Sequence, residues 1–217
     1  MGDDTDLIIE RDGPVAKLTL NRPKALNALT YDQTHRFRDA VAEWAEDDSV
    51  RCMLLAGAGD RAFCDGGDVR AVREAVLDVV ARNGGYDPRT VGMDEAPFGF
   101  FRDEYSLNAE LGAFPKPTVS LLDGVSMGGG LGLALHGSHR IATERSLMAM
   151  PETAIGLFPD VGAAIFLHAA PGAMGLYLGA TGGRVSGAAD ALYLGFSTQS
   201  VPSDRLDAVG PALRAAA

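Results

Sequence analysis

Hydrophobic and polar positions near the start of the chain predict a β-hairpin. Apolar residues open the segment LIIERDGPVAKLTLNRP, a turn is expected at residues 11–14, and alternation resumes from Val15 to Leu20. Pro23 then stops the second strand. The chain therefore opens on two short strands.

The next segments predict a helix, a buried strand and a second helix. Thr30 and Gln33 have capping-box spacing, and the apolar residues from Phe37 to Trp44 follow at positions i, i+3, i+4 and i+7. VRCMLLAGAG then predicts a buried strand that ends in glycine, and FCDGGDVRAVREAV predicts a tight loop that enters a helix.

The remaining segments continue the mixture of strands and helices. Residues 83–99 are rich in Gly, Pro and Asp and predict an exposed loop, at most a lid, before a helix around FRDEYSLNAELGAF. KPTVSLLDGVSMGGGLGLALHG predicts a strand, a glycine-rich turn and a helix, and RIATERSLMAM predicts short strands. The last segment, residues 186–217, predicts a helix, a strand and a final helix after Ser203. The fold class is α/β, although spacing alone does not separate a doubly wound sheet from another layered arrangement.

Length and composition indicate one globular domain without a membrane span. The 217 residues are 47% hydrophobic, which is enough for one sizeable core. The N-terminus lacks the pattern of a secretory signal, and no apolar run is long enough to cross a bilayer. We expect a cytoplasmic protein without a membrane partner. Cys52 and Cys64 lack CxxC spacing and are interpreted as small hydrophobic residues.

The charge of the chain argues against a nucleic-acid partner. The 19 basic and 29 acidic residues give a formal charge of −10, and such a field repels polyanions unless basic residues are concentrated locally. The 27 glycines are spread through turns without repeats, so the backbone is expected to turn tightly or to approach something closely at many points.

Two carboxylates lie in an otherwise apolar stretch. Glu152 and Asp160 fall within MPETAIGLFPDVG, where a straight helix would hold them about 12 Å apart. Gly156 and Pro159 favour a bent loop that can bring them together. Desolvation in such surroundings shifts the pKa of a carboxyl toward values useful in catalysis. Each carboxylate could instead cap a helix or a turn.

Two glycine turns could stabilise an oxyanion. Gly128, Gly129 and Gly130 have no Cβ, so a ligand can lie against the backbone, and the amides at a helix start point toward developing negative charge. CDGGDV, at residues 64–69, is a second glycine turn at a helix start and could supply the opposing donor. Both segments could equally be compact turns without a ligand.

Two other motifs compete with this interpretation. The dinucleotide motif G-x-G-x-x-G is incomplete, because Leu133 and Leu135 stand where its third glycine would be needed. A literal G-x-S-x-G surrounds Ser126, with Asp160 and His168 in hydrolase order, so a serine esterase stays open. A small residue in a tight turn is the other interpretation of Ser126.

The histidines do not predict a metal site. His136 and His139 lie at i and i+3 near a helix end, where histidines more often interact with the last carbonyls, and no acidic third ligand is in register. His35 falls on the first turns of a helix.

Four motifs in this order resemble the crotonase (enoyl-CoA hydratase/isomerase) superfamily, and most closely its 3-hydroxyisobutyryl-CoA hydrolase branch. The motifs are LNRPKALNAL, AFCDGGDVR, KPTVSLLDGVSMGGGLGLAL and MPETAIGLFPDVG, and the match runs from about Leu7 to Val201. The resemblance implies one crotonase-like domain over residues 1–217, a spiral of ββα units, and an acyl-CoA thioester bound between the two glycine turns. It implies no cofactor beyond the coenzyme A moiety of the substrate. The oxyanion donors would be the amides of Gly67 and Gly129.

The resemblance also assigns coenzyme A contacts. They fall on the KALNA stretch, the first glycine turn and the second glycine turn, at Lys24, Ala25, Leu26, Ala28, Gly66, Asp68, Val69 and Gly128. Coenzyme A is polyanionic and needs local cations on an acidic protein. Candidates flank the first glycine turn, namely Arg22, Lys24, Arg61, Arg70 and Arg73.

Two positions decide which branch of the family the chain resembles. Hydratases of this family use two glutamates. The position of the second glutamate is occupied by Gly132 here, so the carboxylate pair becomes Glu152 with Asp160. In the hydrolase branch the glutamate acts on the thioester directly, through an anhydride, or through water, and the aspartate assists. A hydratase or isomerase of the same fold, and a non-catalytic acyl-CoA-binding homologue, are the alternatives.

The chain departs from the family pattern in two ways. Asp65 stands where the family commonly has a small apolar residue. The helical segment that usually follows in this branch is short or missing after Ala217, which leaves activity and oligomeric state open. The resemblance suggests a homo-oligomer, a trimer or a hexamer.

Overall fold

A six-stranded sheet forms the centre of the protein. The computed structural model describes residues 5–85, 87 and 96–216. The large sheet has the order β1-β2-β3-β5-β7-β10. Its first two strands are antiparallel and its remaining neighbours are parallel. The bounds are Leu7–Asp12 (β1), Val15–Leu20 (β2), Cys52–Gly57 (β3), Thr118–Leu122 (β5), His139–Ala142 (β7) and Gln199–Ser200 (β10).

A smaller sheet of four strands accompanies it, in the order β4-β6-β8-β9. Strands β4, β6 and β8 are parallel neighbours, and β9 is antiparallel to β8. The bounds are Ala62–Cys64 (β4), Val125–Met127 (β6), Leu147–Ala149 (β8) and Val185–Ser186 (β9). Consecutive strands alternate between the sheets, from β3 to β4, from β5 to β6 and from β7 to β8, and each pair is followed by helical structure. The chain therefore repeats a ββα unit, as the family resemblance implied.

Eight α-helices and three 3₁₀-helices within the described residues complete the fold. The α-helices are Tyr31–Glu46 (α1), Val69–Asn83 (α2), Ala96–Gly112 (α3), Gly129–Leu135 (α4), Ala163–Ala169 (α5), Met174–Thr181 (α6), Gly187–Tyr193 (α7) and Val209–Ala216 (α8). The 3₁₀-helices are Pro23–Ala25 (η1), Glu152–Ile155 (η2) and Ser203–Ala208 (η3). No described helix has the length and hydropathy needed to span a membrane.

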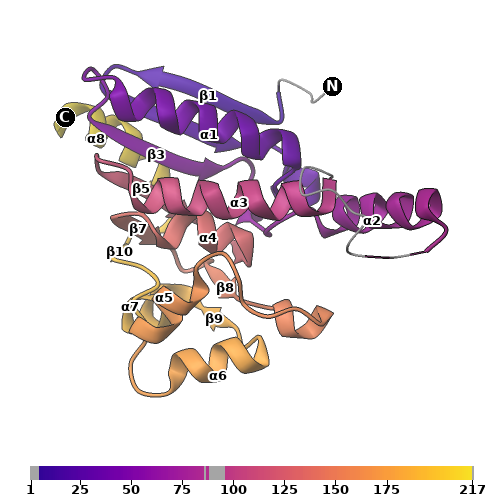
Figure 1. Ribbon diagram of the computed structural model, residues 1–217. Helices are drawn as coiled ribbons and strands as arrows, with labels where there is room; N and C mark the ends of the chain where they lie inside the picture. The colour runs from indigo at the N-terminus through magenta and orange to yellow at the C-terminus, as the bar shows by residue number, and fades with distance from the viewer. Residues whose placement is uncertain (1–4, 86, 88–95, 217) are drawn as a thin grey trace.

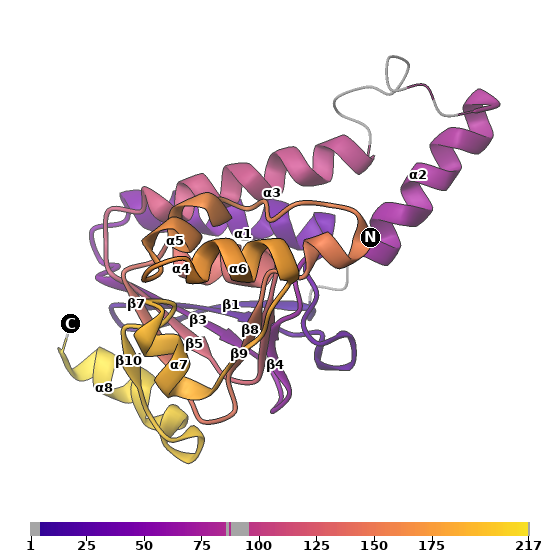
Figure 2. The same cartoon turned by 90° about the horizontal axis from the view of Figure 1, so that it is seen from below.

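The helices cover both faces of the large sheet. Helices α1 and α3 lie side by side across one face, while α2 extends away from the sheets (Figure 1). Arg38 of α1 forms an ion pair with Glu110 of α3, with 2.6 Å between Nη2 and Oε1. Helices α5, α6 and α7 gather near the small sheet (Figure 2). Helix α8 and η3 pack on the other face of the large sheet, where Leu206, Val209 and Leu213 contact apolar strand residues.

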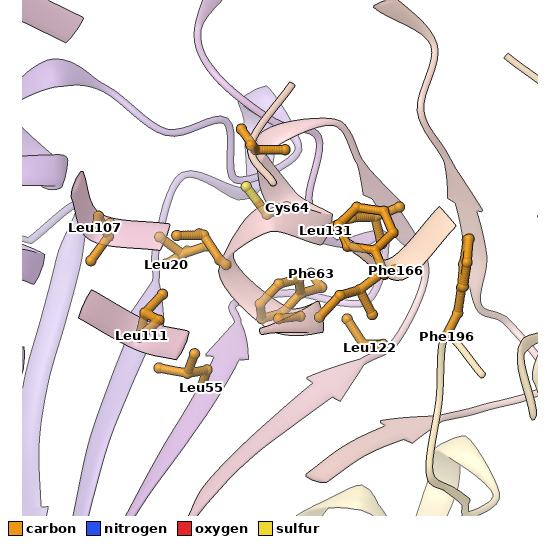
Figure 3. Close-up of a cluster of buried hydrophobic side chains, with 14 of the residues drawn as sticks. Leu20, Leu55, Phe63, Cys64, Leu107, Leu111, Leu122, Leu131, Phe166 and Phe196 are labelled. Carbon is orange, nitrogen blue, oxygen red and sulfur yellow. The ribbon is translucent and has the colours of Figure 1, made fainter. Parts of the chain in front are cut away.

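The main core lies between the large sheet and helices α1, α3 and α4. Figure 3 shows Leu107 and Leu111 of α3 close to Leu20 and Leu55 of the sheet. Every residue of α4 is buried, so the helix that follows the second glycine turn is held on all sides. A loop anchored on α4 consequently has a fixed position.

Most predicted elements are present. The hairpin pairs Leu7 with Leu20, and the capping box of α1 has both of its hydrogen bonds, 3.2 Å from the Gln33 amide to Thr30 Oγ1 and 2.9 Å in return. The single strand expected before the second glycine turn is two strands, β5 and β6, because the chain turns at Gly124 and enters the small sheet. The lid candidate at residues 83–99 lies largely outside the described residues.

Candidate functional site

The candidate site forms where three neighbouring parallel strands end. Strand β4 leads into the first glycine turn, β6 into the second, and β8 into the segment that begins at Met150. The carboxyl ends of parallel strands share one sheet edge, so these three loops are brought together although they are far apart in sequence. The sheet register thus places Gly67, Gly129 and Glu152 at a common location.

A cavity of about 730 Å³ lies between these loops. Every residue predicted for the site lines it, namely Gly67, Gly129, Glu152 and Asp160 for catalysis and Lys24, Ala25, Leu26, Ala28, Gly66, Asp68, Val69 and Gly128 for coenzyme A. The cavity also includes Asp65, whose side chain is exposed, and Glu104 from α3. The structure therefore gathers the predicted residues into one place and adds an acidic side chain.

The backbone directs the amide of Gly67 away from Leu29, the residue with which Gly67 forms a β-bridge. Leu29 forms a parallel bridge with Gly67, in which the Leu29 amide donates to Gly66 (2.8 Å) and the Asp68 amide donates to Leu29 (2.9 Å). Both bonds use the residues that flank Gly67, so its own amide points to the opposite side. No backbone acceptor of this amide is found among the described residues.

Gly129 brings the second amide to the same point. It is the first residue of α4, so its amide has no acceptor inside the helix. A Cβ built on Gly129 would lie 3.2 Å from the Gly67 nitrogen and would collide with the carboxyl of Glu104. Any side chain at residue 129 would crowd both the Gly67 amide and the Glu104 carboxyl, so the two glycine turns and α3 converge on one point.

Glu152 lies beside these amides at the start of η2. Its side chain is 7% exposed, and a Cβ on Gly128 would lie 2.7 Å from its Oε1. Its Oε2 is buried without a hydrogen-bond partner in the described structure. Burial first, and then the negative charge of Asp160, raise the pKa of Glu152 to about 7. Glu152 can therefore exchange its proton near neutral pH.

Glu104 is a functional candidate that the sequence analysis missed. It comes from α3, is 3% exposed, and has a buried Oε1 without a partner in the part of the chain described. Burial, followed by the charges of Asp160 and Glu152, raises the pKa of Glu104 to about 8. A signal was available, because Glu104 occupies the same helical stripe as the buried Phe100, Leu107 and Leu111. An acidic residue on a buried stripe is uncommon unless it has a function.

Asp160 has a partner that the sequence did not reveal. The hydroxyl of Tyr105 donates a hydrogen bond of 2.6 Å to its Oδ2. Burial and this bond raise the pKa of Tyr105, so its hydroxyl keeps the proton. The bent loop expected around Gly156 is present, since Gly156 ends η2 in a left-handed conformation.

The loop that holds the predicted adenine-side residues has a strained backbone. Leu26 and Asn27 both have positive φ angles, 50° and 58°. The buried Asn27 side chain donates to the carbonyls of Ala58 (3.0 Å) and Ala62 (2.8 Å) and accepts from the amide of Arg22 (2.9 Å). These bonds fix the loop against the strand that leads to Gly67.

The predicted cationic side chains differ in whether they already make hydrogen bonds and ion pairs within the protein. Arg22 donates to the carbonyl of Ala28 (2.6 Å) and forms an ion pair with Asp68 (3.0 Å), so it serves the loop itself. Lys24, Arg61 and Arg70 line the cavity, and no ion pair of theirs is found among the described residues. Arg73 is not among the cavity residues.

The serine esterase interpretation is not supported by the geometry. Ser126 lies inside β6 and is fully buried, whereas a nucleophile serine must be exposed on a turn between a strand and a helix. His168 is exposed on α5, and neither residue lines the cavity. Asp160 is hydrogen-bonded to Tyr105 instead.

Two further histidines, His136 and His139, make structural hydrogen bonds. His136 Nε2 donates to the carbonyl of Val161 (2.8 Å), and His139 Nδ1 lies 2.9 Å from Ser138 Oγ. Among the described residues no group of three or more acidic, histidine or cysteine side chains could hold a metal ion.

The chain is similar in sequence to known proteins. The family model described as enoyl-CoA hydratase/isomerase matches residues 15–217. A 3-hydroxyisobutyryl-CoA hydrolase, mitochondrial, from Danio rerio is 41% identical, with 94% of this chain and 50% of the relative covered. A probable 3-hydroxyisobutyryl-CoA hydrolase from Arabidopsis thaliana is 44% identical, with 96% and 51% covered. The chain thus spans about half the length of these relatives.

A solved structure confirms the crotonase-like fold. The carnitinyl-CoA dehydratase from Mycobacterium thermoresistibile has a TM-score of 0.85 and 42% identity, with 98% of this chain and 58% of that chain covered. The two sheets and the repeated ββα units are therefore those of a known architecture.

The comparisons correct the expected location. The Danio rerio relative is named as a mitochondrial protein, and so are those of Xenopus tropicalis and Homo sapiens. These names contradict the cytoplasmic location predicted from the sequence, and that prediction was wrong. The physical reason is that composition and charge do not encode the compartment to which a protein is delivered. From the family model, the relatives and the fold together, the chain belongs to the enoyl-CoA hydratase/isomerase family.

Proposed function

We propose that the protein hydrolyses the thioester of a short 3-hydroxyacyl-CoA such as 3-hydroxyisobutyryl-CoA. The observation that carries the proposal is the meeting of two glycine amides and the buried Glu152 carboxyl in one cavity. The names of the Danio rerio and Arabidopsis thaliana relatives support this substrate.

The two amides would hold the thioester carbonyl oxygen. Its negative charge grows as the carbonyl carbon becomes tetrahedral, and fixed donors in a water-poor site stabilise that charge. Loss of one such donor costs about 3–4 kcal/mol in comparable sites. Gly67 and Gly129 would share this role, because their turns meet within contact distance.

Glu152 would start the reaction from its ionised form. In one route its oxygen attacks the carbonyl carbon, the thiolate of coenzyme A leaves, and water then cleaves the resulting anhydride. In the other route Glu152 takes a proton from a water molecule, whose oxygen attacks the same carbon. Both routes release the free acid and the thiol. A pKa near 7 suits either role, because it leaves a large ionised fraction at neutral pH.

Glu104 and Asp160 would complete the acyl end of the site. A pKa of about 8 keeps Glu104 largely protonated at neutral pH, so it can donate a hydrogen bond to a polar group of the bound substrate. Asp160 would assist Glu152 through its charge. On the coenzyme side, Lys24, Arg61 and Arg70 are available for phosphate groups.

The space around Gly132 favours hydrolysis over hydration. This is the position at which the family resemblance places the second glutamate of a hydratase. A Cβ built on Gly132 would lie 2.6 Å from the Cβ of Val161 and 3.0 Å from Nδ2 of Asn108, so a longer side chain has no room. Without that carboxyl, addition of water across a double bond lacks one of its two proton-transfer groups.

Release of free thiol from 3-hydroxyisobutyryl-CoA tests the proposal. We expect the wild-type protein to release thiol and Glu152→Gln to lose this activity by a factor of 100 or more, on the order of the contribution of general acid–base catalysis. Interconversion of enoyl and hydroxyacyl thioesters without thiol release would identify a hydratase or isomerase instead. Coenzyme A binding without turnover would identify a non-catalytic homologue.

A further inference from the structure

Helix α6 is apolar on nearly every side, yet only one side of it is buried. Gly175 and Gly179 are among its buried residues. A Cβ built on Gly175 would collide with the backbone of Leu167 in α5, so this side of the helix is packed closely. On the outward side, Leu176 is 78% exposed and Tyr177 is 58% exposed. A helix that is apolar all round is normally buried all round, so the outward side of α6 has the composition of a covered surface.

Exposed apolar side chains continue from α6 onto the segments packed beside it. The loop after η2 runs along α6, because a Cβ built on Gly179 would lie 3.6 Å from Cγ of Pro159. Helix α5 lies beside α6 at the edge of the molecule that is far from β1 (Figures 1 and 2). We define the apolar face as the exposed apolar residues of these three segments, namely Ile155, Leu157, Phe158, Ile165, Leu176 and Tyr177.

The sequence around the apolar face lacks formal charge, although the chain as a whole is rich in it. Asp, Glu, Lys and Arg make up 22% of the residues, yet none of them occurs between Asp160 and Arg184. The centres of protein–protein interfaces are depleted in charged residues in the same way. The apolar face therefore has the composition of an interface centre.

The charge of the chain favours a second copy as the occupant of this face. Two copies that each carry a formal charge of −10 repel one another over most of their surfaces. In a twofold-symmetric contact the same patch of both copies meets, so a charged patch would face its own sign. An uncharged apolar patch is complementary to itself. An anionic lipid surface is a poorer occupant, because an acidic chain is repelled by it.

The size of the apolar face fits one half of a dimer interface. At ~200 Å² for a fully exposed residue of this size, the six residues, which are 45% to 78% exposed, offer on the order of 800 Å². A standard interface buries about 800 Å² on each partner. The largest apolar patch of a typical monomer covers roughly 300–600 Å². The face thus exceeds what a monomer usually leaves in water.

We propose that two copies of this chain pair through their apolar faces in a twofold-symmetric dimer. Ile155 and Leu157 belong to the apolar face and also line the cavity of the candidate site. The partner copy therefore forms part of the wall beside the segment that carries Glu152 and Asp160. This inference goes beyond the proposed function and does not depend on it.

Sedimentation equilibrium of the full chain tests the pairing. We expect a mass of two chains, with a Kd of about 10 µM or tighter for an interface of this size. Leu176→Glu places one charge per copy in the paired faces and should raise the Kd by about 100-fold or more. Because Leu176 is 78% exposed, the variant should fold normally, which circular dichroism checks. Leu77→Glu makes the same change at a leucine of α2 that is 47% exposed, and it should leave the Kd unchanged.

Hydrogen exchange measured by mass spectrometry locates the contact and its symmetry. We expect exchange in the dimer to be slower than in the diluted protein at residues 155–158 and 174–178, and unchanged on α2. A face that pairs with itself leaves one protected surface on the chain. Protection of a second, separate surface would show that the face docks elsewhere on the partner copy, and it would overturn the twofold arrangement.

Four other results would overturn the inference. They are a wild-type Kd weaker than ~100 µM, an assembly of more than two chains, an undiminished dimer in folded Leu176→Glu, and equal weakening by Leu77→Glu. Co-sedimentation of a monomeric wild-type protein with phosphatidylglycerol vesicles would assign the face to a lipid surface instead. None of these measurements requires thiol release, so failure of the proposed function would leave the pairing intact.

Discussion

Val161 packs against the backbone of Gly132, so that its Cβ would lie 2.6 Å from any Cβ placed at residue 132. Val161 is a β-branched residue with a φ of +44°, a conformation that is rare for its type. Its carbonyl accepts the hydrogen bond from His136, which helps to hold this backbone. The pair leaves no room for a side chain at residue 132, and this close packing can be tested by substitution.

Gly132→Ala should destabilise the protein by about 1–3 kcal/mol, because the added methyl group overpacks a closed space. Urea unfolding measures this change. Gly210→Ala on α8 is the matched control, since its Cβ would meet only Leu54 Cδ2 at 3.8 Å. Adding Val161→Gly to Gly132→Ala should recover part of the loss, as glycine removes the contact and tolerates the positive φ. If Gly132→Ala leaves the free energy of unfolding unchanged, the packing around residue 132 can relax to take the methyl group.

Gly129→Ala should reduce thiol release far more than it reduces stability. Its methyl group would lie between the Gly67 nitrogen and Glu104, where the substrate oxygen is proposed to bind. We expect kcat to fall on the order of 100-fold or more. Gly112→Ala, whose Cβ would meet His136 at an ordinary 3.6 Å, is the control. Comparable activity in the two variants would remove Gly129 from the oxyanion site.

Stability should fall as the pH rises from about 5 to 8, in part because of Glu104. Its pKa is about 8 in the folded protein and ordinary in the unfolded chain, so the folded state binds the extra proton across this interval. The contribution is complete below the unfolded pKa and is lost as the pH rises through the folded one. Its size is on the order of a few kcal/mol, at 1.36 kcal/mol per pKa unit.

Glu104→Gln should therefore flatten the pH dependence of unfolding free energy and stabilise the protein at pH 8 relative to the wild type. Urea unfolding at pH 5.5 and pH 8 makes the comparison. Glu110→Gln, on the same helix but paired with Arg38 at the surface, serves as the control. An unaltered slope in Glu104→Gln would mean that Glu104 is ionised or well solvated in the folded state.

Asn27→Ala should cost about 2–4 kcal/mol of stability, because three hydrogen bonds of a buried amide are lost together. Asn27→Gly keeps the left-handed backbone accessible and isolates the side-chain bonds from the conformational term. Thermal unfolding gives the first effect, and the KM for acyl-CoA shows whether the loop at residues 24–28 contributes to binding. A change below about 0.5 kcal/mol would contradict the interpretation of this loop.

Local elements could be predicted because their signals are local. The capping box at Thr30 and the alternation through Val15 and Leu20 predict structures that involve only neighbouring residues, and both are present. Helices α5 and α6 were not predicted, since the segment from Ala163 to Thr181 is apolar on nearly every side and shows no clear period.

Part of the site could be predicted because its residues lie in short sequence motifs. Gly67, Gly129 and Glu152 stand in motifs that carry the family resemblance, and the structure places them at one cavity. Glu104 and Tyr105 lie in an ordinary helical segment, so their relation to the site depends on how α3 packs against α4 and the loops. Sequence spacing contains no such information, although the acidic residue on a buried stripe was a usable hint.

The parallel arrangement of β4, β6 and β8 has a consequence for how this scaffold can diversify. Neighbouring strands lie about 4.8 Å apart, so the intervals between the three loop bases are dictated by the hydrogen-bonding lattice of the sheet. Residues at the loop tips can be exchanged without disturbing those intervals. A scaffold of this kind can therefore keep one backbone while the side chains at its loop tips change.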